Sequence, residues 1–265
     1  MSSATVVPLL LLSSVCGARH IQQSTAEASR SNFVATPEQA LSWCSLLPSL
    51  ASDQKRIWLF PSGVRHTRGW LAVLAVAGGT AALMPLDRLE PRYFRSNTSF
   101  NRFNAILSGH NTSIAAAVIP ASLLIVGVFR GDAYARNTAL LAVEAVIDAE
   151  MVTSVMKNIS HRLRPAAVPT NQLGTSTWFR DKGVTLGGAG SFPSGHTIAT
   201  FSVATVFSHR YRHHRWVPYV SYGLAGLVGF SRISLLSHFS SDVLMGAALG
   251  YSISHFVVLR ESGGI

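Results

Sequence analysis

Six apolar stretches of helix length dominate the sequence from Trp70 onward and limit what this chain can fold into. Each is rich in Ala, Leu and Val, and loops carrying Arg, Gly or Pro separate them. Their length and composition are typical of helices rather than strands, so we predict an all-α bundle of about six helices. The stretches cover residues 70–86, 113–129, 138–156, 197–209, 217–230 and 243–259.

The composition favours a bundle embedded in a membrane. Hydrophobic residues make up 48% of the chain and charged residues only 13%, about half the share of an ordinary soluble domain. Most of the stretches are shorter than the roughly 20 apolar residues that a bilayer crossing needs. Three acids also lie in stretch 138–156, and two of them, Glu144 and Asp148, share one helix face. We expect this pair to form a buried polar seam or a solvated face, and a soluble bundle stays open as the alternative.

The N-terminal quarter of the chain has a different texture. Residues 1–18 have the order of a secretory leader, an apolar run followed by small residues, but no basic residues precede the run. Both a cleaved signal peptide and an uncleaved terminus therefore remain open. We interpret residues 19–67 as a linker region with one short helix around 37–50, and residues 68–260 as the helical core. With only Cys16 and Cys44, the chain cannot build a disulfide framework or a thiolate metal site.

The formal net charge of +10 implies an anionic partner. Nucleic acid, anionic lipid and a phosphorylated substrate all carry suitable charge. The basic residues are scattered at helix ends and form no platform with aromatic residues, so we expect no nucleic-acid partner.

If all six stretches cross a membrane, the polar clusters of the sequence fall on one side of it. The two short loops on the other side, "RGDAYARN" and "HRYRHHRW", are rich in arginine. Since positive loops tend to stay in the cytoplasm, we expect the clusters to face the periplasm or the exterior. The protein would then be a multi-pass protein of the cell (inner) membrane.

The first cluster is "KNISHRLRP", at the end of stretch 138–156. Lys157 and Arg164 are seven residues apart, which places them two turns apart on one helix face, and Pro165 is a natural helix stop. Both cations can therefore point at one anion. Snorkelling side chains at a membrane boundary are the alternative interpretation.

The second cluster, "GGAGSFPSGHTIATF", places a glycine-rich turn directly before a predicted helix. The unpaired amides and the positive dipole end of such a helix attract an anion. Ser194 and the backbone of Gly195 can bond to the anion, and His196 can donate a proton to a leaving oxygen. An ordinary serine cap with an incidental histidine is the simpler alternative.

The third cluster is "SRISLLSHFSSD", residues 231–242. Arg232 offers a planar fork for phosphate oxygens. His238 and Asp242 are four residues apart and can meet on one turn, where the carboxylate would fix the imidazole tautomer and leave the other nitrogen as a nucleophile. A structural contact or a metal-ligand pair is the alternative, although a metal usually needs further ligands.

Taken together, the three clusters resemble a known family. Lys157-x6-Arg164-Pro165, then Pro193-Ser194-Gly195-His196, then Ser231-Arg232-x5-His238-x3-Asp242 are similar to the three signature motifs of the type 2 phosphatidic acid phosphatase superfamily, in the same order. The resemblance covers residues 157–242.

The resemblance implies a phosphatase that needs neither a metal nor another cofactor, with its active site at one end of a helical bundle. His238 would be the nucleophile that forms a phosphohistidine, Asp242 its orienting partner and His196 the acid that protonates the leaving alcohol. The phosphoryl oxygens would be held by Lys157, Arg164, Ser194, Gly195 and Arg232.

Three kinds of protein share this set of residues: integral lipid phosphatases, soluble secreted acid phosphatases and vanadium haloperoxidases. The six apolar stretches favour the first kind, which would hydrolyse a lipid phosphomonoester or lipid pyrophosphate. A soluble secreted or periplasmic acid phosphatase is the alternative, and a haloperoxidase is favoured least. The sequence leaves the individual lipid and the oligomeric state open.

Overall fold

The computed structural model describes residues 43–63, 67–172, 175–183, 185, 188 and 190–261, and all regular secondary structure within these ranges is helical. The all-α prediction is confirmed, and each of the six apolar stretches corresponds to one helix. These are α2 (Thr67–Leu83), α5 (Gly109–Arg130), α6 (Ala133–Ser160), α7 (Gly195–Arg210), α8 (Val217–Ser234) and α9 (Ser240–Ile253).

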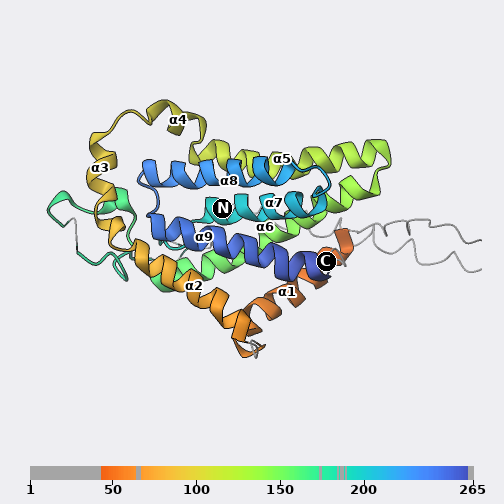
Figure 1. Cartoon of the computed structure of the whole chain (residues 1–265), viewed down its shortest axis with the longest axis horizontal. Helices are drawn as coiled ribbons and strands as arrows, with labels where there is room; N and C mark the ends of the chain where they lie inside the picture. Colours follow the sequence, from red (N-terminus) through yellow and green to blue (C-terminus); the bar gives the residue numbers. More distant parts are fainter. Residues whose placement is uncertain are drawn as a thin grey trace, which may run out of the picture.

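Helix α7 lies at the centre of the bundle, in contact with α5, α6, α8 and α9 (Figure 1). Its Ile198 and Val206 are fully buried. Helix α9 approaches α7 so closely at Gly250 that an added Cβ atom would lie 2.5 Å from the carbonyl oxygen of Ile198. This tight packing fixes the first turn of α7, which carries the second motif, against the second half of α9.

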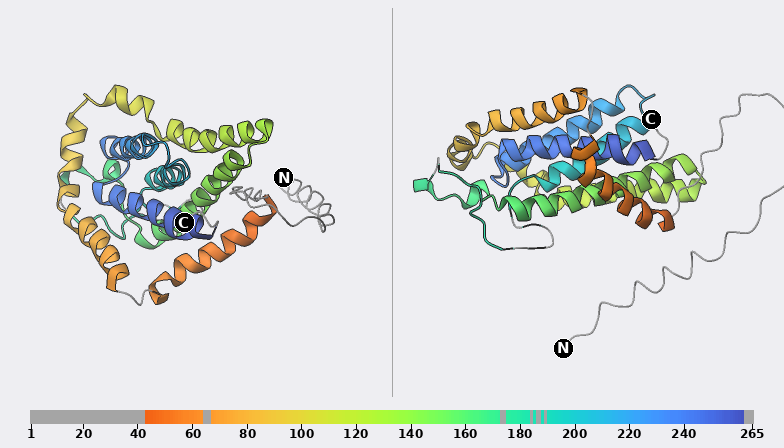
Figure 2. Two further views of the ribbon diagram at one scale, coloured as in Figure 1. Left: turned by 45° about the vertical axis from the view of Figure 1, so that its right-hand side comes forward. Right: turned by 90° about the horizontal axis from the view of Figure 1, so that it is seen from below.

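The outer helices expose apolar side chains rather than polar ones. Among the described residues, three segments are long and apolar enough to cross a membrane, and they are Trp70–Arg88, Gly109–Arg130 and Ser240–Val258. Helices α2 and α5 lie at the periphery (Figure 2), where Leu74 is 62% exposed and Phe129 is 86% exposed. A continuous apolar exterior is typical of a protein whose solvent is lipid.

Helix α1 (Trp43–Gly63) is longer than the short helix expected around residues 37–50. It packs on α6, where Gln54 Nε2 donates to Asp148 Oδ1 at 2.9 Å. Glu144 and Asp148 are both buried, so the expected polar seam is present. The leader interpretation of residues 1–18 lies outside the described residues.

Short elements gather at the end of the bundle shown on the left of Figure 1. Helices α6 and α8 end there, and α7 and α9 begin there, so the three sequence motifs lie at this end. At the C-terminal side, α9 continues through a π-helical turn, η4 (Ser254–Val258), into α10 (Leu259–Glu261). The short elements at the motif end are η1 (Leu86–Arg88), α3 (Glu90–Ser96), α4 (Asn101–Ile106), η2 (Pro165–Ala167) and η3 (Thr170–Gln172).

Candidate active site

His238 lies in the turn between α8 and α9 and is only 2% exposed. Its Nδ1 atom is 2.7 Å from the backbone carbonyl oxygen of Ser191 and 3.7 Å from Oδ2 of Asp242. The carbonyl can only accept, so Nδ1 carries the proton and Nε2 keeps its lone pair. The expected orientation of the imidazole is therefore provided by Ser191, and Asp242 is beyond hydrogen-bond distance of the ring.

Asp242 is the third residue of α9, and its carboxylate caps the start of its own helix. Oδ2 accepts from the backbone N–H of Phe239 at 2.9 Å and from the hydroxyl of Ser191 at 2.5 Å. Oδ1 accepts from Nη1 of Arg162 at 2.5 Å. These three bonds are the physical reason why the carboxylate is turned away from the imidazole: a helix N-terminus and a guanidinium are its nearer partners.

His196 and Arg232 both approach the start of α5. His196 Nε2 is 3.1 Å from the carbonyl oxygen of Gly109 and 3.1 Å from Oγ of Ser113. Arg232 is buried and bonds to the carbonyl oxygen of Leu107. A Cβ atom added to Gly109 would lie 3.4 Å from Arg232 Nη1 and 3.5 Å from His196 Nε2, which shows how close these two side chains lie.

Lys157, Gly195 and His196 line a common cavity of about 340 Å³ between α5, α6 and α7. A Cβ atom added to Gly195 would lie only 3.3 Å from Nζ of Lys157, so the absence of a side chain at this position gives the ammonium its place. The wall of the cavity contains both polar and apolar side chains. It is completed by Thr112, Ser113, Ala116, Ala117, Val146, Glu150 and Ala199.

Two predicted phosphate ligands, Ser194 and Arg164, do not line the cavity that contains Lys157 and His196. The hydroxyl of Ser194 is buried and bonded to Oγ1 of Thr197 at 2.8 Å, so it is not oriented toward an open space. Arg164 does not share a helix face with Lys157 as expected, because α6 ends at Ser160 and Arg164 is in extended backbone with an exposed side chain. The charge of Arg164 still reaches the site. Burial lowers the pKa of His238 most, Asp242 raises it in part, and the charges of Lys157 and Arg164 lower it further.

The electrostatics favour the neutral form of both histidines. Burial lowers the pKa of His238, and Asp242 opposes this effect in part. Burial and then the charge of Arg232 lower the pKa of His196, which lies outside the three candidate spans, to about 4. A neutral imidazole is the form that a nucleophile needs.

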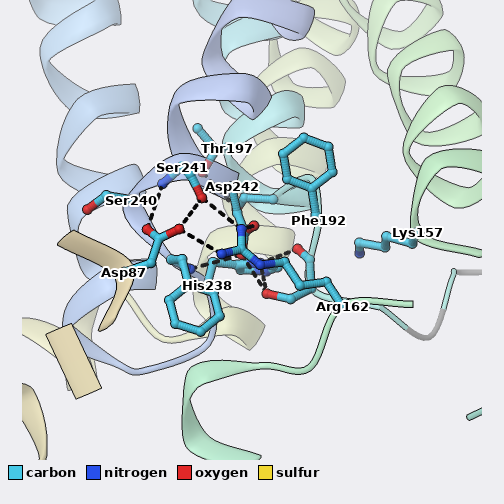
Figure 3. A network of polar contacts seen from close by, with 12 residues as sticks. Asp87, Lys157, Arg162, Phe192, Thr197, His238, Ser240, Ser241 and Asp242 are labelled. Carbon is cyan, nitrogen blue, oxygen red and sulfur yellow. Dashed lines mark hydrogen bonds and ion pairs between the residues drawn. The ribbon is translucent and has the colours of Figure 1, made fainter. Parts of the chain in front are cut away.

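The sequence interpretation missed Arg162 and Asp87. Arg162 lies inside "KNISHRLRP" and is 2% exposed, although nothing in that pattern distinguishes it from the neighbouring Arg164. It forms ion pairs with Asp87 and Asp242 (Figure 3). Among the described residues, no three His, Cys, Asp or Glu side chains are grouped as ligands of one metal ion.

Comparison with known proteins gives this arrangement a context. Residues 138–262 match the family model described as PAP2 superfamily. A lipid A 1-phosphatase of Porphyromonas gingivalis is 44% identical over 83 residues, which are 28% of this chain and 19% of that protein. A lipid A 4'-phosphatase of the same organism is 35% identical over 71 residues, which are 27% of this chain and 30% of that protein. The match thus spans less than a third of either relative.

Among solved structures, the chain is similar to a transmembrane PAP2 type phosphatidylglycerolphosphate phosphatase from Bacillus subtilis, with 19% identity and a TM-score of 0.42. That similarity covers 84% of this chain and 96% of the other. The family model covers all three motifs and four of the helices that meet at the site. Residues 138–262, which hold all three motifs, are thus the part of this chain that resembles the PAP2 superfamily.

Proposed function

We propose that this protein is a metal-independent phosphatase that releases phosphate from a lipid phosphomonoester or a lipid pyrophosphate. One observation carries the proposal: His196 lies beside Arg232 at Gly109, shares a cavity with Lys157 and is close enough to His238 for an electrostatic interaction, although these residues come from three separate motifs. Two imidazoles and two cations that close together suit transfer of a phosphoryl group.

The first step would be attack of Nε2 of His238 on phosphorus. The imidazole proton stays on Nδ1, which donates a hydrogen bond to the carbonyl oxygen of Ser191. The lone pair of Nε2 is therefore free to form the new N–P bond. The P–O bond to the leaving alcohol breaks, and His196 supplies the proton that the leaving oxygen takes up. The result is a phosphohistidine and a free alcohol.

The cations would stabilise the charge on the transferred group. Lys157, Arg164 and Arg232 neutralise its oxygens, and the first amides of α7, including that of Gly195, add the positive end of a helix. Ser194 would assist once its bond to Thr197 opens. In the second step water attacks the phosphohistidine, His196 accepts a proton from that water, and phosphate leaves with His238 restored.

A lipid substrate agrees with the surroundings of the site. The cavity that contains His196 is also lined by Ala116, Ala117, Val146 and Ala199, which give it an apolar wall. The relatives named above are called lipid A phosphatases, which are enzymes for phosphorylated lipids. We place the protein in the cell membrane as a multi-pass protein, with the site toward the periplasm or exterior because the arginine-rich loops lie at the other end of the bundle.

The decisive experiment measures phosphate release from a panel of lipid phosphates and pyrophosphates by the parent and by His238→Ala. We expect the variant to lose activity about a thousandfold or more. A matched control is His209→Ala, at the opposite end of α7, which should keep the parent activity. Turnover retained in folded His238→Ala would contradict the assigned nucleophile.

Two further measurements separate the related alternatives. Vanadate should inhibit as a phosphate mimic, whereas a chelator should leave activity unchanged. Loss of activity in chelator that added metal restores would contradict a metal-independent reaction. Resistance of the membrane-bound protein to carbonate extraction separates the integral phosphatase from a soluble acid phosphatase.

A further inference from the structure

Two buried carboxylates share one guanidinium beside the candidate nucleophile. Arg162 Nη2 lies 2.7 Å from Oδ2 of Asp87, and Arg162 Nη1 lies 2.5 Å from Oδ1 of Asp242 (Figure 3). The exposed fractions of the three side chains are 2%, 5% and 0%. Arg162 therefore joins η1, which precedes the family-matched region, to the first turn of α9.

The plane of the guanidinium is fixed as well as its position. Its central carbon lies 4.6 Å from the ring centre of Trp178 and 4.3 Å from that of Phe239. Arg162 Nε also donates to Oγ1 of Thr177 at 3.2 Å. A rigid fork between two aromatic rings can serve two carboxylates at once, which a lysine ammonium cannot do with the same geometry.

Asp87 completes the arrangement by binding the start of α9 directly. Its Oδ2 accepts from the hydroxyl of Ser241 at 2.6 Å, and its Oδ1 accepts from the backbone N–H of Ser241 at 3.3 Å. The same hydroxyl accepts from Nη1 of Arg162 at 2.7 Å. Glu90 accepts from the neighbouring amide of Ser240 at 3.1 Å, so acids from outside the helix hold its first turn.

Arg162 also reaches His238 through its backbone. The carbonyl oxygen of Arg162 accepts from the N–H of Ser191 at 2.7 Å, and the carbonyl oxygen of Ser191 accepts from Nδ1 of His238 at 2.7 Å. On the other side, the guanidinium holds Asp242, which in turn holds the amide of Phe239, the residue after His238. One residue thus holds both Ser191, whose carbonyl accepts from the imidazole, and Asp242, whose carboxylate lies 3.7 Å from it.

We propose that Arg162, held by Asp87, is a positioning residue that sets the orientation of His238 for attack on phosphorus. This inference rests on the proposed phosphatase function. Arg162 lines a separate cavity of about 220 Å³, together with Trp178 and Phe239, and not the cavity that contains Lys157 and His196. It acts on the nucleophile and not on the phosphate, so its loss lowers kcat and leaves KM nearly unchanged.

The test uses the full-length protein in detergent, with kcat expressed per folded molecule. Arg162→Gln leaves two buried carboxylates without their shared cation, and we expect a loss of about 100-fold in kcat with KM within about twofold of the parent. Arg162→Lys keeps the positive charge but not the planar fork, so we expect its kcat to lie between those of the parent and of Arg162→Gln. Asp87→Asn keeps Arg162 paired with Asp242, and we expect a loss of about tenfold.

The double variant Asp87→Asn/Arg162→Gln distinguishes a shared device from two independent structural contacts. If Asp87 acts through Arg162, the double variant loses no more kcat than Arg162→Gln alone. Losses that multiply, a KM that rises with the fall in kcat, or an unchanged kcat in folded Arg162→Gln would each overturn the proposal.

Arg210→Gln is the matched control for loss of an ordered arginine. Arg210 stacks on Tyr134 at 3.8 Å and bonds to Thr138, at the opposite end of α7, so kcat should stay at the parent value even if the unfolding temperature falls. If neither the parent nor this control releases phosphate from any lipid, the proposed function fails. The positioning inference is then decided by the unfolding temperatures: shifts that are not additive for Asp87→Asn and Arg162→Gln support the coupling, and additive shifts overturn it.

Discussion

The carbonyl oxygen of Ser191 lies 2.7 Å from Nδ1 of His238, a full ångström closer than the carboxylate of Asp242. A backbone carbonyl cannot be removed by substitution, so the tautomer of His238 survives changes at residue 242. The carboxylate contributes through its charge and through its bonds to Ser191 and Phe239.

We therefore expect Asp242→Asn to be less damaging than His238→Asn. The amide keeps an acceptor for the Phe239 amide but loses its charge, and kcat should fall by about 100-fold while some turnover remains. His238→Asn should leave no measurable turnover. Phosphate release by the two variants, normalised to folded protein, checks this order. Equal losses would show that the carboxylate, not the Ser191 carbonyl, sets the tautomer.

The role of His196 as a proton donor predicts a dependence on the leaving group. An alkyl phosphate needs its leaving oxygen protonated, whereas p-nitrophenolate leaves as a stable anion. His196→Gln should thus lose about 100-fold or more with a lipid phosphate and much less with p-nitrophenyl phosphate. Steady-state kinetics with both substrates measure the difference. The same fold-loss for the two substrates would exclude the assigned role.

The low pKa of His196 predicts that phosphate binding takes up a proton. In the empty site that pKa is about 4, because of burial and then the charge of Arg232. A bound anion offsets the cations Arg232 and Lys157, so the pKa of His196 rises in the complex. Affinity for inorganic phosphate should then weaken as pH rises between the two pKa values.

Inhibition by inorganic phosphate at a series of pH values measures this effect. His196→Gln is the control, since the titration of phosphate itself and of His238 remains in it. We expect the inhibition constant of His196→Gln to change less with pH than that of the parent. The difference between the two should be up to about tenfold per pH unit. Identical pH dependences for parent and variant would rule out a proton taken up by His196.

A side chain at Gly195 is predicted to disturb the position of Lys157. A methyl group there would lie 3.3 Å from Nζ of Lys157 and 3.6 Å from Oε1 of Glu150, and would displace the ammonium. We expect Gly195→Ala to raise KM by about tenfold, with a cost of about 1 kcal/mol in the free energy of unfolding. KM for a lipid phosphate and the denaturation midpoint are the measurements.

The matched control is Gly226→Ala in α8, where an added Cβ atom has no neighbour within 4 Å. Since alanine is the better helix former, this variant should be as stable as the parent or more stable, with unchanged KM. A parent-like KM in Gly195→Ala would mean that Lys157 does not need its present position.

Much of the fold is readable from the sequence because helix formation in this chain follows local apolar content. All six stretches became helices, and α5 ends at Gly131 as local rules anticipate, whereas α6 ends at Ser160, five residues before Pro165. Helices α3 and α4 escaped prediction because they are short and half polar. The length of α1 escaped it for another reason: its helix is stabilised by packing on α6 through Gln54 and Asp148, a contact 94 positions apart in the chain.

The candidate site was predictable where a motif dictates chemistry and not where tertiary structure assigns partners. The spacing of His238 and Asp242 predicts that they lie near each other, and they are 3.7 Å apart, although His238 precedes α9 and does not share a helical turn with Asp242. The spacing cannot show that a carbonyl 47 positions away is the nearer partner of the imidazole. Arg162 and Asp87 were missed for the same reason. Their pairing across 75 positions depends on how η1 folds over α9.

The acids that hold the first amides of α9 have a practical consequence for anyone trimming this protein. A fragment limited to residues 138–262 would retain every histidine, lysine and arginine nominated for chemistry, yet Asp87 and Glu90 would be gone. The leading amides of that helix would then face solvent or lipid without their acceptors. The smallest autonomous unit must accordingly begin upstream of η1, well before the boundary that family resemblance alone would suggest.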